Sequence, residues 1–121
     1  EKGLLGRKSG KGFYDYTNGS NIPDPTINTK LGKMIFSRIV AILINEAVDA
    51  LNLEIATRED IDIAMTTGVN YPKGLLKWAD EIGLKNIYNR LCKLNSESND
   101  DRYNPSPLLI KLVKENGAFY T

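Results

Sequence analysis

The sequence predicts an all-α fold, a bundle of about five helices preceded by an irregular leader. Three observations support this class. Apolar residues recur at helical spacing over most of the chain after residue 28. Turns that contain glycine or proline divide these stretches into lengths typical of helices. No stretch shows a convincing strand pattern, so we do not expect a sheet.

Residues 1–28 are expected to form a basic, glycine-rich leader and a linker. The alternating aromatic residues of the leader suit an extended segment in which Phe13 or Tyr14 is buried. Two prolines within 17–28 favour extended backbone before the first helix. The helical unit should therefore occupy residues 29–121.

The first helix is predicted to run from about Thr29 to Leu53. Ile35, Ile39 and Ile42 share one of its faces, and its centre is apolar nearly all round. Such a helix needs cover on every side, so we expect the other helices to surround it.

A second helix is expected to start at Thr57, which can cap it, and to end at Gly68. The residues from Thr57 to Asp60 approximate a capping box, with Asp in place of the usual Glu or Gln. The residues expected to face the core are Ile61, Ala64 and Met65.

Three further helices complete the bundle. The third should cover about 74–82 and stop at Gly83, and the fourth should cover about 84–97. Ser106 can cap the last helix, which has a proline in its first turn and should reach about Glu115.

Composition excludes several classes of function. Sixteen basic residues against fifteen acidic ones give no field that would attract nucleic acid. No apolar run approaches the roughly 20 residues that span a bilayer. The chain has no histidine, so it offers no imidazole base, no His-ligated metal and no Ser-His-Asp site. We therefore expect no catalytic, cofactor-binding or metal-binding residue, no membrane partner and no nucleic acid. The single cysteine, Cys92, suits a reducing compartment, and a cytoplasmic location is expected.

Polar residues in the predicted helices have structural and functional interpretations. Glu46 is either a general base with a raised pKa or, as we favour, a partly buried carboxylate held by hydrogen bonds or by Arg38 or Arg58. Asn45 is expected to be an amide that packs helices together. Asp60 and Asp62 begin a helix, where the helix dipole stabilises negative charge.

A short pattern occurs twice. Gly12-Phe13-Tyr14 near the start is echoed by Ala118-Phe119-Tyr120 near the end, each after a turn that contains glycine. This repetition indicates a module boundary, with the tail of one unit followed by one complete unit.

Several motifs follow one another in a specific order. They are the run Gly6-Arg7-Lys8-Ser9-Gly10-Lys11-Gly12-Phe13-Tyr14-Asp15-Tyr16, then Asn45-Glu46-Ala47, Asp60-Ile61-Asp62, Gly68 with Tyr71-Pro72, and Asp80-Glu81-Ile82-Gly83. In that order they resemble the helical C-terminal domain of the 3-hydroxyacyl-CoA dehydrogenases, a fold like the C-terminal domain of 6-phosphogluconate dehydrogenase. The resemblance marks these residues as structural candidates: Gly10, Gly12, Phe13, Tyr14, Asn45, Glu46, Asp62, Gly68, Pro72, Asp80 and Gly83.

The resemblance implies an NAD-dependent enzyme that oxidises (3S)-3-hydroxyacyl-CoA, with its base and its NAD on a separate nicotinamide-binding domain. Two residues depart from the family pattern. Ser37 stands where the family has a substrate-side Asn, and Lys73 stands where it has an apolar Met. Both departures fit a copy that keeps the fold and has lost the chemistry, so we expect this chain alone to be inactive.

The leader run resembles the signature that closes the helical domain, yet here it precedes one. The resemblance therefore implies two such domains in tandem, with residues 1–28 ending the first. The expected role of residues 29–121 is packing against the nicotinamide-binding domain of the same polypeptide, together with homodimerisation or repeat–repeat packing. An apolar stripe left exposed would mark that contact.

The leader also permits a phosphate-binding interpretation. It fails the P-loop pattern, because Leu5 stands at the first glycine, and Asp15 breaks the dinucleotide fingerprint. Its three cations could still contact the phosphates of an acyl-CoA: Arg7, Lys8 and Lys11. The alternative is a tight packing turn whose glycines allow positive φ and whose Phe13 fills a groove. Two other functions stay open for the whole chain, a freestanding helical interaction module and a small CoA or nucleotide binder.

Overall fold

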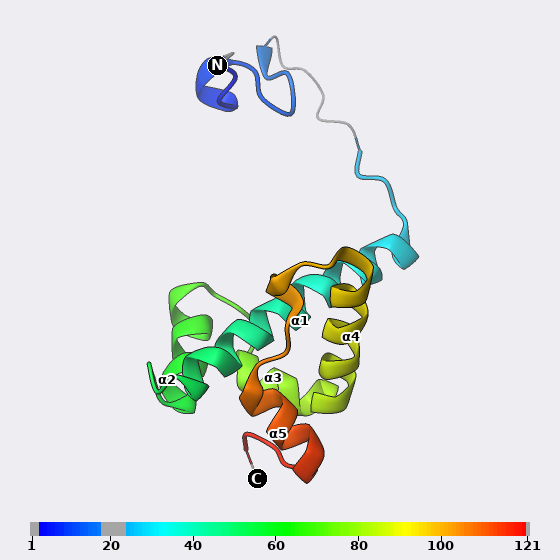
Figure 1. Ribbon diagram of the computed structural model, residues 1–121. Coiled ribbons are helices and arrows are strands. Elements are labelled where there is room, and N and C mark those ends of the chain that lie inside the picture. Colours follow the sequence, from blue (N-terminus) through cyan, green and yellow to red (C-terminus); the bar gives the residue numbers. More distant parts are fainter. Residues whose placement is uncertain (1–2, 18–23, 121) are drawn as a thin grey trace.

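The computed structural model describes residues 3–17 and 24–120 and shows five α-helices (Figure 1). No strand is present in these residues, so the predicted all-α class is confirmed. The elements of the bundle are α1 (Thr29–Asn52), α2 (Arg58–Ile63), the π-helix η3 (Ala64–Gly68), α3 (Leu75–Ile82), α4 (Leu84–Ser98), the 3₁₀ helix η4 (Asp101–Tyr103) and α5 (Pro107–Glu115).

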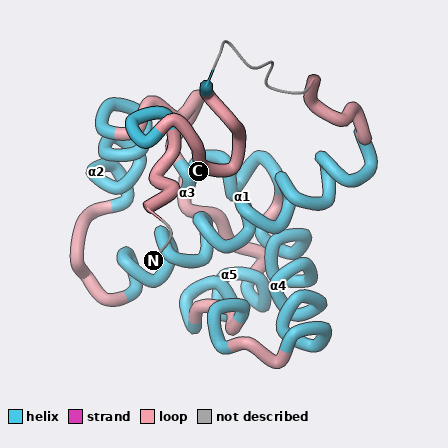
Figure 2. The backbone as a smooth tube through the Cα atoms, turned by 90° about the horizontal axis from the view of Figure 1, so that it is seen from above, coloured by secondary structure: helices cyan, strands magenta, loops and turns pink. Residues whose placement is uncertain are grey.

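The long helix α1 is the central element. It begins after Asn28, whose side chain accepts a hydrogen bond from the Leu31 N–H at 2.9 Å. Helices α2, α3, α4 and α5 all pack against it, and Figure 2 shows α4 and α5 packed together along one side. Its buried apolar residues form the centre of the core: Val40, Ala41, Ile44, Ala47 and Val48.

The first part of α1 extends beyond the helices that cover its second part (Figure 1). Ile35 is 48% exposed and Ile39 is 50% exposed, so the expectation that helices surround α1 is correct only from Val40 onward. The physical reason is length, because 24 residues at about 1.5 Å each exceed the span of the shorter helices around them.

The start of α2 differs from a capping box. The Thr57 hydroxyl accepts from the Asp60 N–H at 3.1 Å and donates to the Asp60 carboxylate at 2.7 Å. Asp60 therefore does not reach back to the backbone of Thr57, because its side chain is one methylene shorter than Glu. Ala64 is exposed, contrary to expectation, whereas Ile61 and Met65 pack against the core.

The helix then continues as η3, where threonine hydroxyls donate hydrogen bonds to backbone carbonyls of the preceding turn. Thr66 donates to the carbonyls of Asp62 and Ile63 at 3.0 and 3.1 Å, and Thr67 donates to that of Ile63 at 2.7 Å. These bonds compete with the regular i→i+4 ladder, which accounts for the wider π turn.

The chain between α4 and α5 is fixed to α1 by buried contacts. The Asn45 amide donates to the Asn104 carbonyl and accepts from the Ser106 N–H, both at 2.9 Å. The sequence predicted that Ser106 would cap α5, but its side chain makes no capping hydrogen bond. The buried Ser106 hydroxyl has no hydrogen-bond partner within the described residues. The Arg38 guanidinium hydrogen-bonds the hydroxyl of buried Tyr103 and lies 5.1 Å from the centre of its ring.

The leader forms a compact turn with the short 3₁₀ helix η1 (Arg7–Ser9), not an extended segment. The Ser9 hydroxyl accepts from the Leu5 N–H at 2.8 Å and donates to the Gly6 and Lys11 carbonyls. Phe13 is fully exposed and Tyr14 is 43% exposed, so the expected burial of one of them is wrong for this chain. The alternation of aromatic residues predicts that one face of the leader is apolar, but it does not indicate which surface covers that face.

Candidate functional site

Two aspartates join α2, α3 and the last described residues of the chain, 117–120, here called the closing segment. The Asp80 carboxylate on α3 accepts the N–H groups of Phe119 at 3.0 Å and Tyr120 at 2.8 Å. Phe119 is 5% exposed and belongs to the core. One carboxylate that binds two successive amides fixes both the path and the direction of this segment.

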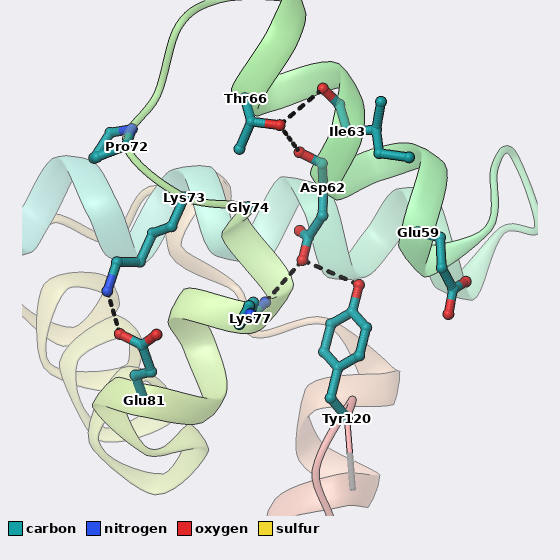
Figure 3. Close-up of a pocket in the computed structure, with 10 residues that line it drawn as sticks. All are labelled: Glu59, Asp62, Ile63, Thr66, Pro72, Lys73, Gly74, Lys77, Glu81 and Tyr120. Atoms are coloured by element: carbon teal, nitrogen blue, oxygen red, sulfur yellow. Dashed lines mark hydrogen bonds and ion pairs between the residues drawn. The ribbon is translucent and has the colours of Figure 1, made fainter.

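Asp62 on α2 makes the second junction. Its carboxylate accepts from the N–H groups of Leu76 at 2.8 Å and Lys77 at 3.0 Å, at the N-terminus of α3. The Tyr120 hydroxyl donates to the same carboxylate at 3.1 Å, as Figure 3 shows. Burial, followed by this hydrogen bond to a charged acceptor, raises the pKa of Tyr120 to about 12. Asp62 therefore caps one helix and binds the closing segment at the same time.

Gly74 makes this arrangement possible. It occupies the N-cap position of α3 and has no side chain to cap the helix, so the acceptor comes from α2. A Cβ on Gly74 would lie 2.1 Å from Cγ of Asp62 and 2.3 Å from its Cβ. No side chain fits there while Asp62 keeps its position.

Arg58 on α2 also contacts the closing segment. Its guanidinium lies 5.0 Å from the centre of the Tyr120 ring and donates to the Phe119 carbonyl. Its Nε also contacts Glu59 at 2.6 Å, and hydrogen bonding to Glu59 raises the pKa of Arg58. One cation, Arg58, and two carboxylates, Asp62 and Asp80, thus bind residues 119 and 120.

A broad hollow of about 760 Å³ lies beside this junction (Figure 3). Its rim carries both signs of charge, including the ion pair between Lys73 and Glu81. The Asp62 carboxylate at its base is already occupied by three donors. Within the described residues, no three His, Cys, Asp or Glu side chains gather as a metal site would require. The geometry of Asp62 and Asp80 is that of a structural junction, because backbone N–H groups and the Tyr120 hydroxyl occupy both carboxylates.

The other candidates on the bundle are dispersed. Glu46 is exposed, and no hydrogen bond or ion pair links it to another described residue, so the expected partly buried carboxylate is wrong. The arginines proposed as its partners, Arg38 and Arg58, bind Tyr103 and the closing segment instead.

The remaining bundle candidates occupy turns. Gly68 is the last residue of η3, and a Cβ added there would meet no neighbouring group within 4 Å. The left-handed backbone expected of a helix-ending residue occurs instead at Asn70, whose φ is 56°. Pro72 lies at the rim of the hollow, and Gly83 (φ 89°) joins α3 to α4.

The leader candidates contact other residues of the leader. Arg7 lies 5.5 Å from the centre of the Tyr16 ring, and Lys11 lies 3.6 Å from the Asp15 carboxylate. Lys8 belongs to η1. Gly10 has φ 74°, and a Cβ on Gly12 would lie 2.7 Å from the Gly6 Cα. The glycines thus permit a very tight turn, while Phe13 points away from any cover.

Sequence reasoning missed Arg58 as a partner of the closing segment, and it missed Gly74 as the residue that makes room for Asp62. One signal in the sequence pointed to the role of Gly74. A helix that starts after Gly74, with no acceptor side chain at its N-cap, needs an acceptor from elsewhere. The sequence could not say that this acceptor is Asp62.

None of the helices within residues 3–17 and 24–120 combines the length and the apolar character that crossing a bilayer requires.

Comparison with known proteins gives a consistent picture. The sequence profile of the family described as "3-hydroxyacyl-CoA dehydrogenase, C-terminal domain" matches residues 34–118. The 3-hydroxyadipyl-CoA dehydrogenase of Escherichia coli K12 is 45% identical over 76 residues, which cover 63% of this chain and 16% of that protein. The peroxisomal fatty acid beta-oxidation multifunctional protein AIM1 of Arabidopsis thaliana is 33% identical over 133 aligned positions, which cover 90% of this chain and 18% of that protein.

A solved structure of 3-hydroxybutyryl-CoA dehydrogenase from Escherichia coli K12 superposes with a TM-score of 0.62 and 42% identity. The superposition covers 65% of this chain and 17% of that one. The chain spans less than a third of the length of the curated relatives it matches.

Proposed function

The chain belongs to the 3-hydroxyacyl-CoA dehydrogenase family, in which it matches the C-terminal domain, and from this premise we propose that it is the helical domain of an NAD-dependent enzyme of acyl-CoA metabolism. The observation that carries the proposal is the family match over residues 34–118 in a chain that has no histidine. Without an imidazole base the hydride chemistry falls to another part of the polypeptide. In this proposal NAD binds to a nicotinamide-binding domain, and residues 29–121 pack against it.

We also propose that residues 1–28 are the end of a preceding helical copy. The junction at Asp62 and Asp80 supports this, because it binds a Phe-Tyr pair through the pair's own backbone. The leader carries the same pair at Phe13 and Tyr14, fully or partly exposed. The alignment with the multifunctional relative supports the same proposal. Its 90% coverage exceeds what residues 34–121 alone could supply, so it reaches into the leader or linker.

The packing surface that we propose is the exposed apolar strip on the first part of α1. Its members are 45% to 53% exposed: Leu31, Met34, Ile35 and Ile39. Side chains four residues apart lie on one side of a helix, so the strip is continuous. An apolar surface of this kind costs free energy in water and is typical of an interface. The partner is an adjoining helical copy or, in a homodimer, the same domain of a second chain.

Two finer features belong to the same proposal. The leader cations Arg7, Lys8 and Lys11 lie on the segment that would border an acyl-CoA in the complete enzyme. The enzyme would work in the cytoplasm, although some relatives are named as peroxisomal proteins.

The test uses the complete polypeptide. Changing Ile35 and Ile39 together to Asp places two charges in the proposed interface, so 3-hydroxyacyl-CoA-dependent NADH formation should fall at least about tenfold. Ile55→Asp is the matched control, because Ile55 is 72% exposed and lies outside the strip. Equal activity in both variants would exclude the strip as the interface.

A second candidate is a freestanding helical interaction module, which the same exposed strip would suit. The complete polypeptide distinguishes the two, because a module without metabolic role would have no adjoining nicotinamide-binding domain and would form no NADH.

A further inference from the structure

One face of α1 is accessible to solvent along almost the whole helix. Its residues follow one another at intervals of three or four, the spacing that keeps side chains on one side of a helix. Two of them are half-buried, Ile42 and Asp49, and the others are exposed. We call this surface the α1 face, and its residues are Leu31, Ile35, Ile39, Ile42, Glu46, Asp49 and Leu53. The strip described above is therefore the first half of a longer surface.

The second half of the α1 face carries two carboxylates, Glu46 and Asp49. Neither side chain has a hydrogen bond or an ion pair to another residue in the described part of the chain. Apolar residues flank them on the same face, with Ile42 before and Leu53 after. Acidic groups at such positions indicate a partner that brings both apolar area and positive charge.

The first half of the α1 face carries the opposite charge. Arg38 is exposed and lies between Ile35 and Ile42 at the same helical spacing. Its guanidinium hydrogen-bonds a neutral group, the Tyr103 hydroxyl, and none of the ion pairs in residues 3–17 and 24–120 includes it. The charge of Arg38 also acts on Asp100, but that carboxylate is hydrogen-bonded to its neighbour in sequence, Arg102. The α1 face is thus basic in one half and acidic in the other.

A second copy of the same face complements this charge pattern when the two helices run antiparallel. If a two-fold axis passes at Ile42, each residue lies opposite the residue equally far away on the other side of Ile42. Arg38 then lies opposite Glu46 of the second copy, with Asp49 one turn further along, and Leu31 lies opposite Leu53. A parallel arrangement would place Arg38 against Arg38 and Glu46 against Glu46, which is repulsive.

The same register brings apolar groups together beside the charges. An apolar hollow of about 340 Å³ lies between α1 and α2, next to Glu46. Its walls on α1 include Leu43 and Ala47. Ile39 is on the same side of α1 as Leu43, four residues away. In the antiparallel register Ile39 of the second copy lies at the level of residue 45, so it borders this hollow.

We propose that two copies of this chain form an antiparallel dimer through the α1 face, with the two-fold axis at Ile42 and an ion pair between Arg38 and Glu46 of the second copy. Such an interface is isologous and closes at two subunits, because each copy offers the same surface. The contact follows α1, whose 24 residues span about 36 Å, so it is not confined to one helical turn. The inference rests on the packing role proposed for the strip, and it names the partner and the pairing of residues.

Sedimentation equilibrium of the 121-residue chain tests this proposal. The unchanged chain should show a reversible monomer–dimer equilibrium. Arg38→Glu and Glu46→Arg each bring like charges together twice in one dimer, so each should raise the dimer dissociation constant at least about tenfold. Lys33→Glu is the matched control, because Lys33 is an exposed cation of α1 whose position falls outside the α1 face. This control should change the constant less than about twofold.

Mixing the two charge-reversal variants separates pairing from damage to the fold. In a heterodimer of Arg38→Glu with Glu46→Arg, each new charge meets an opposite one. The 1:1 mixture should therefore dimerise within about threefold of the unchanged chain, although each variant alone does so weakly. If Arg38→Glu does not fold, Ile42→Cys in a Cys92→Ser background decides. Two residues on the axis face each other, so mild oxidation should link that variant to itself and should leave Ile55→Cys in the same background unlinked.

Three results would overturn the proposal: a chain that stays monomeric at about 1 mM, a mixture that dimerises no better than its components, or no preferential linkage at Ile42. None of these results depends on turnover. A monomeric chain together with a loss of NADH formation in the Ile35 and Ile39 double variant would overturn the dimer and leave the proposed function standing. Dimerisation with unchanged NADH formation in that variant would do the reverse.

Discussion

Asp62 should be the most important single carboxylate for the stability of the bundle. Asp62→Ala removes an acceptor from the N–H groups of Leu76 and Lys77 and from the Tyr120 hydroxyl. Loss of a helix cap typically costs about 0.5 to 2 kcal/mol. The bond from Tyr120 to a charged acceptor adds roughly 1 kcal/mol, reduced from its full value because Asp62 is only half-buried. The expected total is a loss of about 1.5 to 3 kcal/mol in the free energy of unfolding.

Thermal unfolding followed by circular dichroism measures this loss. For a domain of this size a cost of about 1.5 to 3 kcal/mol lowers Tm by roughly 5 to 20 °C. Asp60→Ala is the control, because Asp60 lies two residues earlier in the same helix and, among the described residues, its carboxylate accepts only from the Thr57 hydroxyl. That variant should lower the free energy of unfolding by less than about 1 kcal/mol. If Asp62→Ala costs no more than Asp60→Ala, the assignment of Asp62 as the junction of α2, α3 and the closing segment is wrong.

Three further predictions concern Gly74, Asp100 and Tyr120. Gly74→Ala should cost about 1 to 3 kcal/mol, since its Cβ would displace Asp62, whereas Gly68→Ala has open space and should be nearly neutral in urea unfolding. Hydrogen bonding from Arg102 lowers the pKa of Asp100 from 3.8 to about 2, so its stabilising contribution is complete above pH 3.8 and is lost as the pH falls toward 2. Asp100→Asn should accordingly flatten the acid side of a Tm-against-pH curve, and an unchanged curve would contradict this. Burial and the Asp62 contact raise the pKa of Tyr120 from 10.0 to about 12, so stability should decline between pH 10 and 12 and Tyr120→Phe should lessen that decline. Titration of tyrosinate absorbance should show a tyrosine that titrates near pH 12 and is missing in this variant.

Local signals predicted the helices well. Pro107 and Glu115 bound the last helix where the sequence placed it, because a proline in the first turn and Asn116 in left-handed conformation are decided within a few residues. The same is true of α1, which Asn28 caps directly.

Contacts between distant residues were not predictable in this way. Helical spacing identified Ile35 and Ile39 as apolar, but it carries no information about where the neighbouring helices stop. Asp62 was expected to interact with its own helix, yet its carboxylate accepts hydrogen bonds from the backbone N–H groups of Leu76 and Lys77, which lie 14 and 15 residues later. Glu46 lies in the apolar part of α1 but at a position that the bundle leaves exposed.

The most direct test of the proposed function is an assay of this chain alone for 3-hydroxyacyl-CoA-dependent reduction of NAD, followed by absorbance of NADH. A helical domain without histidine, which relies on a base and a cofactor held elsewhere, should form no NADH above the uncatalysed background. NADH formation that depends on both the substrate and this purified chain would contradict the account.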